Sequence, residues 1–180
     1  KPADSKVFLA GRGAGNVVNE LNILGFETDV CEIEKRMEEI GENYFGLTKN
    51  TNIIIDDARH AIKVTKKKYD VVILDISAGE NQPNNLYTIE GFSDIKKMMK
   101  PDAALFVHYP TVLNAPDGLA LKSIRKTMDA AGFHTEFINT SPDVNGVWEY
   151  ILFATIDGSS LTEKNFDRRD HFADPFNFPL

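Results

Sequence analysis

Seven short apolar runs alternate with longer amphipathic stretches along this chain, and that alternation limits the possible folds more than any other feature. The apolar runs have the length and composition of buried strands: residues 6–10, 27–33, 51–55, 69–75, 103–109, 134–138 and 148–155. Helix-like stretches separate the first six of them, near residues 15–24, 34–45, 58–66, 87–99 and 117–131. Regular alternation of strand and helix predicts a mostly parallel sheet with helices on both faces.

The last two apolar runs break this alternation. Only residues 139–147 separate them, a segment too short for a helical crossover, so these two strands should form an antiparallel hairpin. We therefore predict an α/β fold, namely a Rossmann-like, doubly wound, mostly parallel seven-stranded sheet that ends in an antiparallel hairpin. This ending departs from the all-parallel dinucleotide-binding fold and is typical of the class I methyltransferase-like fold, whose enzymes bind S-adenosylmethionine.

The length of the chain favours one domain. With 180 residues, of which 42% are hydrophobic, the chain can bury one sizeable core but not two. We expect this domain to span residues 1–157. Residues 158–180 include four phenylalanines and should form an ordered arm packed on the domain. The alternative is a lid or an oligomer contact, for example in a homodimer.

Charge and cysteine content argue against several classes of partner. Asp and Glu number 27 against 20 Lys and Arg, so we expect no nucleic-acid partner. No apolar run is long enough to cross a bilayer, and we expect no membrane contact by this segment. The single cysteine, Cys31, rules out an internal disulfide and suits a reducing compartment, which predicts a cytoplasmic protein. The four histidines lack metal-ligand spacing, so we predict no metal site.

Three glycines follow the first strand directly. Gly11, Gly13 and Gly15 allow a tight turn, a close approach to a ligand and backbone amides that point out of a helix N-terminus. The third glycine falls one residue earlier than in the G-x-G-x-x-G dinucleotide motif, because position 16 is Asn16. The motif alone leaves a structural turn and a ligand-binding turn both open, and an NAD-dependent dehydrogenase is a distant alternative.

Acidic residues at the ends of the next two strands favour the ligand-binding interpretation. Glu32 stands where a carboxylate can accept hydrogen bonds from both hydroxyls of a ribose, and Glu34 is its alternative. Asp57 follows the third strand, where an acceptor can meet the amino group of an adenine, and Asp56 competes with it. Either aspartate can instead cap the helix that begins at Ala58.

Asp75 closes the fourth strand, and a buried parallel sheet directs such a residue into the ligand crevice. His108, at the end of the fifth strand, is expected to be a core or rim residue, with assistance at the crevice as the alternative. Tyr87 is our candidate for flanking an acceptor pocket, although a large aromatic residue there can equally belong to the core.

Four segments together resemble the spermidine synthase family of polyamine aminopropyltransferases, in its divergent, spermidine-synthase-like branch: GRGAG (11–15), CEIE (31–34), DDAR (56–59) and YDVVILDISAGENQPNNLYTIEGF (69–92). The family shares the class I methyltransferase fold, and the match covers roughly residues 6–109. The resemblance implies that Gly11, Gly13 and Gly15 line a sulfonium nucleoside, that Glu32 binds its ribose, and that Asp57 with Ala58 meets the adenine. Asp75 would be the catalytic acid–base residue.

Two positions depart from the pattern of that family. Typical members carry aspartates where this chain has Ala14 and Ala78, and those carboxylates help to hold a cationic aminopropyl chain. Arg12, if it points inward, can instead pair with the carboxylate of intact S-adenosylmethionine, whereas a solvated turn residue is the more ordinary expectation.

The sequence thus predicts a transferase whose group donor is S-adenosylmethionine or its decarboxylated form, with no metal. The main hypothesis is transfer of an aminopropyl-type group from the decarboxylated donor to a small amine, because a carboxylate at Asp75 can accept the amine proton and attract the cation. Ala14 and Ala78 favour S-adenosylmethionine-dependent methyl transfer as the alternative. A domain that binds a ligand or partner without catalysis is the third possibility.

Overall fold

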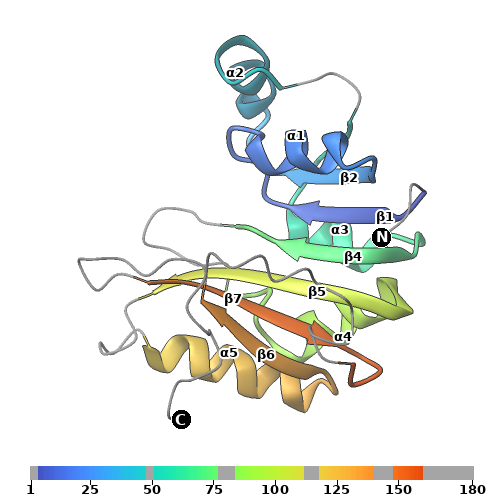
Figure 1. Ribbon diagram of the computed structural model, residues 1–180, viewed down its shortest axis with the longest axis vertical. Helices are drawn as coiled ribbons and strands as arrows, with labels where there is room; N and C mark the ends of the chain where they lie inside the picture. Colours follow the sequence, from blue (N-terminus) through green and yellow to red (C-terminus); the bar gives the residue numbers. More distant parts are fainter. Residues whose placement is uncertain (1–3, 48–50, 77–83, 112–117, 140–147, 160–180) are drawn as a thin grey trace.

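The computed structural model describes residues 4–47, 51–76, 84–111, 118–139 and 148–159. Their strands are β1 (Lys6–Ala10), β2 (Glu27–Glu32), β3 (Asn52–Ile55), β4 (Tyr69–Leu74), β5 (Met99–Thr111), β6 (His134–Asn139) and β7 (Trp148–Thr155). Their helices are α1 (Asn16–Ile23), α2 (Arg36–Tyr44), α3 (Ala58–Val64), α4 (Ile89–Met98) and α5 (Gly118–Ala130). The predicted order of strands and helices is confirmed (Figure 1).

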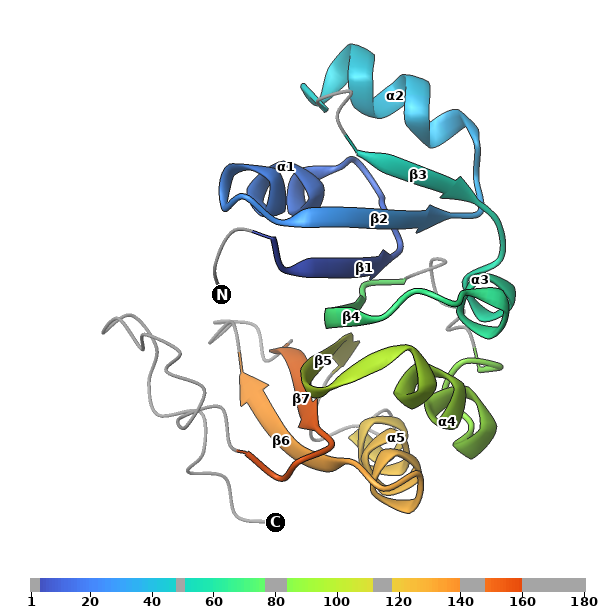
Figure 2. The same cartoon turned by 90° about the vertical axis from the view of Figure 1, so that its right-hand side faces the viewer.

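One seven-stranded sheet contains all of these strands, in the order β3-β2-β1-β4-β5-β7-β6 (Figure 2). The pairs β1–β2, β1–β4, β2–β3 and β4–β5 are parallel. Strand β7 lies between β5 and β6 and runs antiparallel to both. The predicted doubly wound α/β sheet with an antiparallel ending is therefore confirmed.

Strand β5 begins earlier than the apolar run that predicts it. Met99 pairs with Tyr69 immediately after α4, and the register then shifts before Ala104 pairs with Val71. Lys100, Pro101 and Asp102 lie in this irregularity, where the Lys100 Nζ donates to Asp70 Oδ2 at 2.8 Å. Hydrophobicity alone therefore places the start of the strand four residues too late.

Both faces of the inner strand β1 are covered. Val7 and Leu9 belong to a cluster with Val18 and Leu21 of α1, so they face that helix. The alternate residues, Phe8 and Ala10, face the larger core that includes side chains of α3, α4 and α5. A strand buried on both faces reads as the continuous apolar run seen in the sequence.

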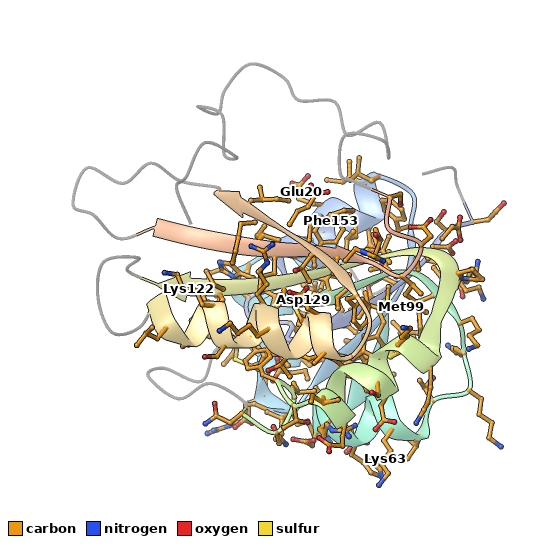
Figure 3. The ribbon with its side chains drawn as sticks, turned by 90° about the horizontal axis from the view of Figure 1, so that it is seen from below. Glu20, Lys63, Met99, Lys122, Asp129 and Phe153 are labelled. Atoms are coloured by element: carbon orange, nitrogen blue, oxygen red, sulfur yellow. The ribbon has the colours of Figure 1, made fainter. Side chains whose placement is uncertain are left out.

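The antiparallel end of the sheet adds a smaller cluster. Phe106 of β5 and Phe153 of β7 lie with their ring centroids 5.3 Å apart. In Figure 3, Phe153 lies on the side of β7 away from α5, the helix that carries Lys122 and Asp129. Phe153 is 1% exposed, so the face of β7 opposite the α5 helix is also buried.

A polar network connects β2 to the start of β4, away from the carboxyl ends of the parallel strands. Asp29 is buried and accepts hydrogen bonds from Lys67 Nζ at 2.7 and 3.0 Å, from the Tyr69 hydroxyl at 2.7 Å and from the Asn52 amide. Burial raises the pKa of Asp29, but the hydrogen bonds from Lys67, Asn52 and Tyr69 outweigh it and leave that pKa below its ordinary value.

Because the pKa of Asp29 is lowered in the folded protein, its ionised carboxylate stabilises the fold. This stabilisation is fully present above the ordinary pKa of an aspartate and is lost as the pH falls through the pKa of Asp29 in the folded protein. We expect Asp29→Asn to reduce the free energy of unfolding by about 2 kcal/mol at pH 7, and by less in acid. Urea unfolding at pH 7 and at a series of acidic pH values measures this difference. Asp102→Asn, at an exposed aspartate, is the control. Equal stabilities of the Asp29 variant and the wild type at pH 7 would contradict the assignment.

Candidate active site

The glycine turn lies between the carboxyl ends of β2 and β4. Gly11 has φ +89°, and its amide donates to the Cys31 carbonyl at 3.0 Å. A Cβ at Gly11 would lie 2.0 Å from the Asp75 carbonyl oxygen, so no larger residue fits there without moving the backbone. Gly13 also has a positive φ, +50°, but a Cβ there would meet no atom within 4 Å. Gly15 immediately precedes α1.

Glu32 lies beside this turn at the end of β2. Its Oε2 accepts a hydrogen bond from the Arg12 amide at 3.1 Å, and its Oε1 accepts one from the Glu34 amide at 2.9 Å. The Glu34 carboxylate instead binds the Arg36 guanidinium at 2.7 and 2.9 Å, and these hydrogen bonds lower the pKa of Glu34 to about 2. Glu32, rather than its alternative Glu34, is therefore the carboxylate fixed against the glycine turn.

Arg12 is buried, contrary to the expectation of a solvated turn residue. Only 4% of it is exposed, and its Nη2 donates to the Glu38 carbonyl of α2 at 3.3 Å. Its Nε and Nη1 are buried and have no hydrogen-bond partner among the described residues. Burial lowers the pKa of the Arg12 guanidinium, although Glu38, Glu32 and Glu42 oppose that effect. The expectation fails because α2 packs over the turn, and Arg12 therefore connects the turn to that helix.

Asp57 and Asp56 both have structural partners where α3 begins. Asp57 is exposed and caps the helix, accepting from the His60 amide at 3.0 Å. Asp56 lies 2.6 Å from His60 Nδ1 and also accepts from the Asp57 amide at 2.8 Å, and the hydrogen bond from His60 lowers the pKa of Asp56. Ala58 is the first residue of α3. The capping role left open by the sequence is therefore present at Asp57.

Asp75 follows β4 directly and touches the glycine turn. Its amide donates to the Ala10 carbonyl at 2.8 Å, which continues the β1–β4 pairing past the end of the strand. Its carboxylate Oδ1 lies 2.7 Å from Nδ1 of His108, and 36% of the Asp75 side chain and 31% of the His108 side chain are exposed. His108 is therefore a rim residue, one of the two expectations for it, and it lies in hydrogen-bond contact with the candidate catalytic carboxylate.

Tyr87 is packed among aromatic rings near Asp75. Its ring stacks on Phe92 with centroids 6.3 Å apart and meets Tyr109 edge-on at 6.2 Å. The hydroxyl oxygen is buried and has no hydrogen-bond partner among the described residues. Burial, together with Tyr109 and Asp75, raises the pKa of Tyr87. Tyr87 thus combines core packing with a polar group close to the candidate catalytic carboxylate.

Ile33 is a candidate that the sequence analysis missed. The apolar run 27–33 includes it as a buried strand residue, but β2 ends at Glu32 and Ile33 is 71% exposed. It therefore presents apolar surface directly beside the Glu32 carboxylate. The only signal for Ile33 in the sequence is that an apolar residue directly follows Glu32, the acidic residue expected to bind the ribose.

Contacts join these groups along one edge of the sheet. The Asp56 amide donates to the Glu32 carbonyl at 3.1 Å, Arg12 binds Glu32, and Gly11 touches Asp75. The arrowheads of β1, β2 and β3 point to the right in Figure 2, toward the edge where α3 begins. The carboxyl ends of parallel strands at the point where the strand order reverses, as between β1 and β4, are the usual ligand position in such folds. Ala78 lies outside the described residues.

Metal-binding clusters and membrane-spanning helices are both absent from the described part of the chain. Within it, no three His, Cys, Asp or Glu side chains lie close enough together to hold a metal ion. None of the described helices combines the length and the apolar character needed to cross a lipid bilayer.

Comparison with known proteins identifies relatives for nearly the whole described chain. Residues 1–156 match the family model described as the spermine/spermidine synthase domain. A polyamine aminopropyltransferase from Thermoplasma volcanium is 26% identical over 160 residues, which are 84% of this chain and 58% of that protein. An N-terminal histidine N-methyltransferase from Emericella nidulans is 29% identical over 112 residues, which are 59% of this chain and 20% of that protein. The chain spans about half the length of most of the polyamine aminopropyltransferases that it matches.

Solved structures agree with the fold. The spermidine synthase of Thermotoga maritima superposes with a TM-score of 0.74 at 18% identity, covering 99% of this chain and 66% of that one. Human methyltransferase-like protein 13, in complex with SAH, also gives a TM-score of 0.74, at 16% identity, covering 89% of this chain and 77% of that one. The family match extends over both the glycine turn and Asp75, and the resemblance inferred from the sequence is confirmed: the chain belongs to the spermine/spermidine synthase family.

Proposed function

We propose that this chain transfers an aminopropyl-type group from a decarboxylated S-adenosylmethionine-like donor to a small amine. The observation that carries the proposal is the contact between the glycine turn and Asp75, where a Cβ on Gly11 would lie 2.0 Å from the Asp75 carbonyl oxygen. A candidate nucleoside-binding turn thus lies against the backbone of Asp75, a residue whose carboxylate can act as a base. Membership of the spermine/spermidine synthase family and relatives named polyamine aminopropyltransferases support it.

Glu32 is the proposed ribose ligand. Each of its carboxylate oxygens accepts one backbone hydrogen bond, and an ionised carboxylate oxygen can accept another. The two ribose hydroxyls are donors that suit such a pair of acceptors. Because the backbone amides fix the carboxylate in place, little side-chain entropy is lost when the nucleoside binds.

The adenine would lie over Ile33 and near the start of α3. Ile33 offers exposed apolar surface for the face of the base, and Asp57 with Ala58 lies at the adjoining strand end. Asp57 uses one carboxylate oxygen to cap α3, and a carboxylate has further acceptor positions for an amino group.

Asp75 is the proposed acid–base residue. The acceptor amine arrives as a cation, gives a proton to the carboxylate, and attacks the carbon attached to the sulfonium. The nitrogen–carbon bond forms as the carbon–sulfur bond breaks, and the electron pair stays on sulfur to give a neutral thioether. Tyr87 would line the acceptor side, since its buried hydroxyl lacks a hydrogen-bond partner among the described residues and lies near Asp75.

Methyl transfer from intact S-adenosylmethionine is the second candidate function. Ala14 leaves the glycine turn without the carboxylate that would favour a decarboxylated, cationic donor tail. A relative named N-terminal histidine N-methyltransferase and the structural match to human methyltransferase-like protein 13 support this alternative.

The unit that we propose as the transferase domain is residues 1–157, with residues 158–180 as an arm packed on it. Thr155, the last residue of β7, donates through its hydroxyl to the Ser159 carbonyl at 2.9 Å. The rest of the arm, from residue 160, lies outside the described residues. We further propose a cytoplasmic setting, from the single cysteine, and no metal requirement.

Isothermal calorimetry with both donors tests the proposed function. We expect the decarboxylated donor to bind at least about tenfold more tightly than S-adenosylmethionine, because the carboxylates of Glu32 and Asp75 repel a third negative group. Tighter binding of S-adenosylmethionine would shift the assignment to methyl transfer. Binding of neither donor would contradict both, and binding of NAD would indicate a dinucleotide enzyme instead.

Glu32→Gln is expected to weaken donor binding by about 10- to 100-fold, since hydrogen bonds to a charged acceptor contribute about 1.5–3 kcal/mol. Glu34→Gln is the matched control: it removes a neighbouring carboxylate that binds Arg36 rather than the glycine turn. Calorimetry on both folded variants measures the difference. Equal losses in the two variants would show that Glu32 has no specific contact with the nucleoside.

A further inference from the structure

The carboxylate of Asp75 has an imidazole partner to which the proposed function assigns no role. His108 lies on β5, the strand parallel to β4, and the pairing of Leu74 with Val107 places His108 next to Asp75. The distance from His108 Nδ1 to Asp75 Oδ1 is 2.7 Å, a normal length for a charge-assisted hydrogen bond. Roughly a third of each side chain is exposed, so protons can be exchanged with solvent or substrate.

This geometry has two consequences for Asp75. An ionised carboxylate can only accept hydrogen bonds, so His108 Nδ1 carries the proton, and this hydrogen bond holds Asp75 Oδ1 in place. The charge of the pair then depends on the imidazole: it is negative when His108 is neutral and zero when His108 is protonated. A pair without net charge attracts a cationic amine less and accepts its proton less readily.

Among the described residues, the groups around the pair are mostly uncharged. Tyr87 precedes α4, and the raised pKa of Tyr87 keeps its hydroxyl protonated at neutral pH. Tyr109 follows His108 on β5, and Ile151 of β7 stands opposite His108 in the antiparallel register. The backbone of the glycine turn lies against Asp75 from the β1 side. Among the pair and these described groups around it, His108 is therefore the one whose side-chain type changes charge near neutral pH.

We propose that His108 is a positioning residue of the transfer reaction, which fixes the Asp75 carboxylate and permits turnover only while its own imidazole is neutral. This inference rests on the proposed function. Asp75 Oδ1 stays bound to His108, and Oδ2 takes the proton from the acceptor ammonium. The nitrogen then bonds to carbon, the sulfur leaves with the carbon–sulfur electron pair, and Asp75 later returns the proton to water.

An NMR titration of His108 in the 180-residue chain tests the pair without any turnover. We expect the imidazole of His108 to titrate at least about one pH unit lower in Asp75→Asn than in the wild type, because the variant removes an adjacent negative charge. The signal of His134, on β6, serves as the internal reference. An unchanged titration of His108 would overturn the proposed coupling whether or not the protein is a transferase.

The pH dependence of turnover tests the consequence for catalysis, with decarboxylated S-adenosylmethionine and 1,4-diaminobutane as probes. His108→Ala should lower kcat by about 10- to 100-fold with little change in the donor KM. His108→Asn keeps an N–H donor near the position of Nδ1 but cannot titrate. It should restore most of the lost kcat at pH 8 and move the acid limb of the profile about two pH units lower, toward the range of a lone carboxylate.

These outcomes separate the inference from the function on which it rests. An active His108→Asn enzyme with the acid limb of the wild type would overturn the inference and leave the proposed function intact. A wild-type protein that turns over neither donor would overturn the proposed function, and with it the catalytic role of His108. A purely structural His108 would lower stability in both variants without moving the acid limb.

Discussion

Asp75→Asn is expected to lower kcat by about 10³-fold, which corresponds to about 4 kcal/mol of transition-state stabilisation. An amide cannot accept the proton of the acceptor amine, and it no longer attracts a cation. Donor binding should change by less than about threefold, because Glu32 and the glycine turn hold the nucleoside in the proposed complex. Initial rates at saturating donor, with calorimetry on the same preparation, measure both quantities.

Asp70→Asn is the matched control for this variant. Asp70 lies on the same strand, β4, but at its opposite end, where it accepts from the Lys6 amide at 2.9 Å and from Lys100 Nζ at 2.8 Å. Its loss should affect stability and leave the kcat of the folded protein as it was. Full activity in Asp75→Asn would remove the case for Asp75 as the base. Equal losses of kcat in both variants would point to a general effect on β4.

Gly11→Ala is expected to lower the free energy of unfolding by about 4 kcal/mol. The alanine Cβ would lie 2.0 Å from the Asp75 carbonyl oxygen, so the backbone of β1 or β4 must move, and overpacking of this kind costs about 1–3 kcal/mol. The φ of +89° adds about 1–2 kcal/mol for a residue with a side chain. Urea unfolding, or the Tm if the variant is too unstable for that method, measures the loss.

Gly13→Ala separates the two contributions. Gly13 lies in the same turn with φ +50°, but a Cβ there would meet no atom within 4 Å. The cost should therefore be only the backbone term of about 1 kcal/mol. If both variants lose the same amount, the close approach between Gly11 and Asp75 is absent in solution.

The sequence predicts the fold well because its main determinants are local. The strand at 6–10 is apolar at every position after Lys6, as a strand covered on both faces must be, and the short link after residue 139 leaves no room for a crossover. The early start of β5 is not predictable in this way, because two charged residues and Pro101 interrupt the apolar pattern at 100–102 and only the pairing of Met99 with Tyr69 reveals it.

The site is predicted less completely, because it depends on register between strands and on packing at a distance in sequence. The sequence favours Glu32 but leaves Glu34 as an alternative, and only the structure shows that Glu32 binds the glycine turn while Glu34 binds Arg36. His108 becomes the partner of Asp75 through the alignment of β4 with β5. Arg12 is buried because α2 folds over it, which no property of residues 11–15 indicates.

The position of β7 between β5 and β6 has a consequence for how the protein is made. During synthesis from the N-terminus, β5 and β6 emerge before β7. Until residues 148–155 leave the ribosome, β5 lacks one of its two neighbours and β6 lacks its only neighbour. Leu152, Phe153 and Ala154 are fully or almost fully buried in the finished sheet, so β7 must pair with the edge of β5 and bring β6 into the sheet on its other side. A chain that stalls before Trp148 would therefore leave the edge of β5 open and β6 without a partner in the sheet, which favours aggregation.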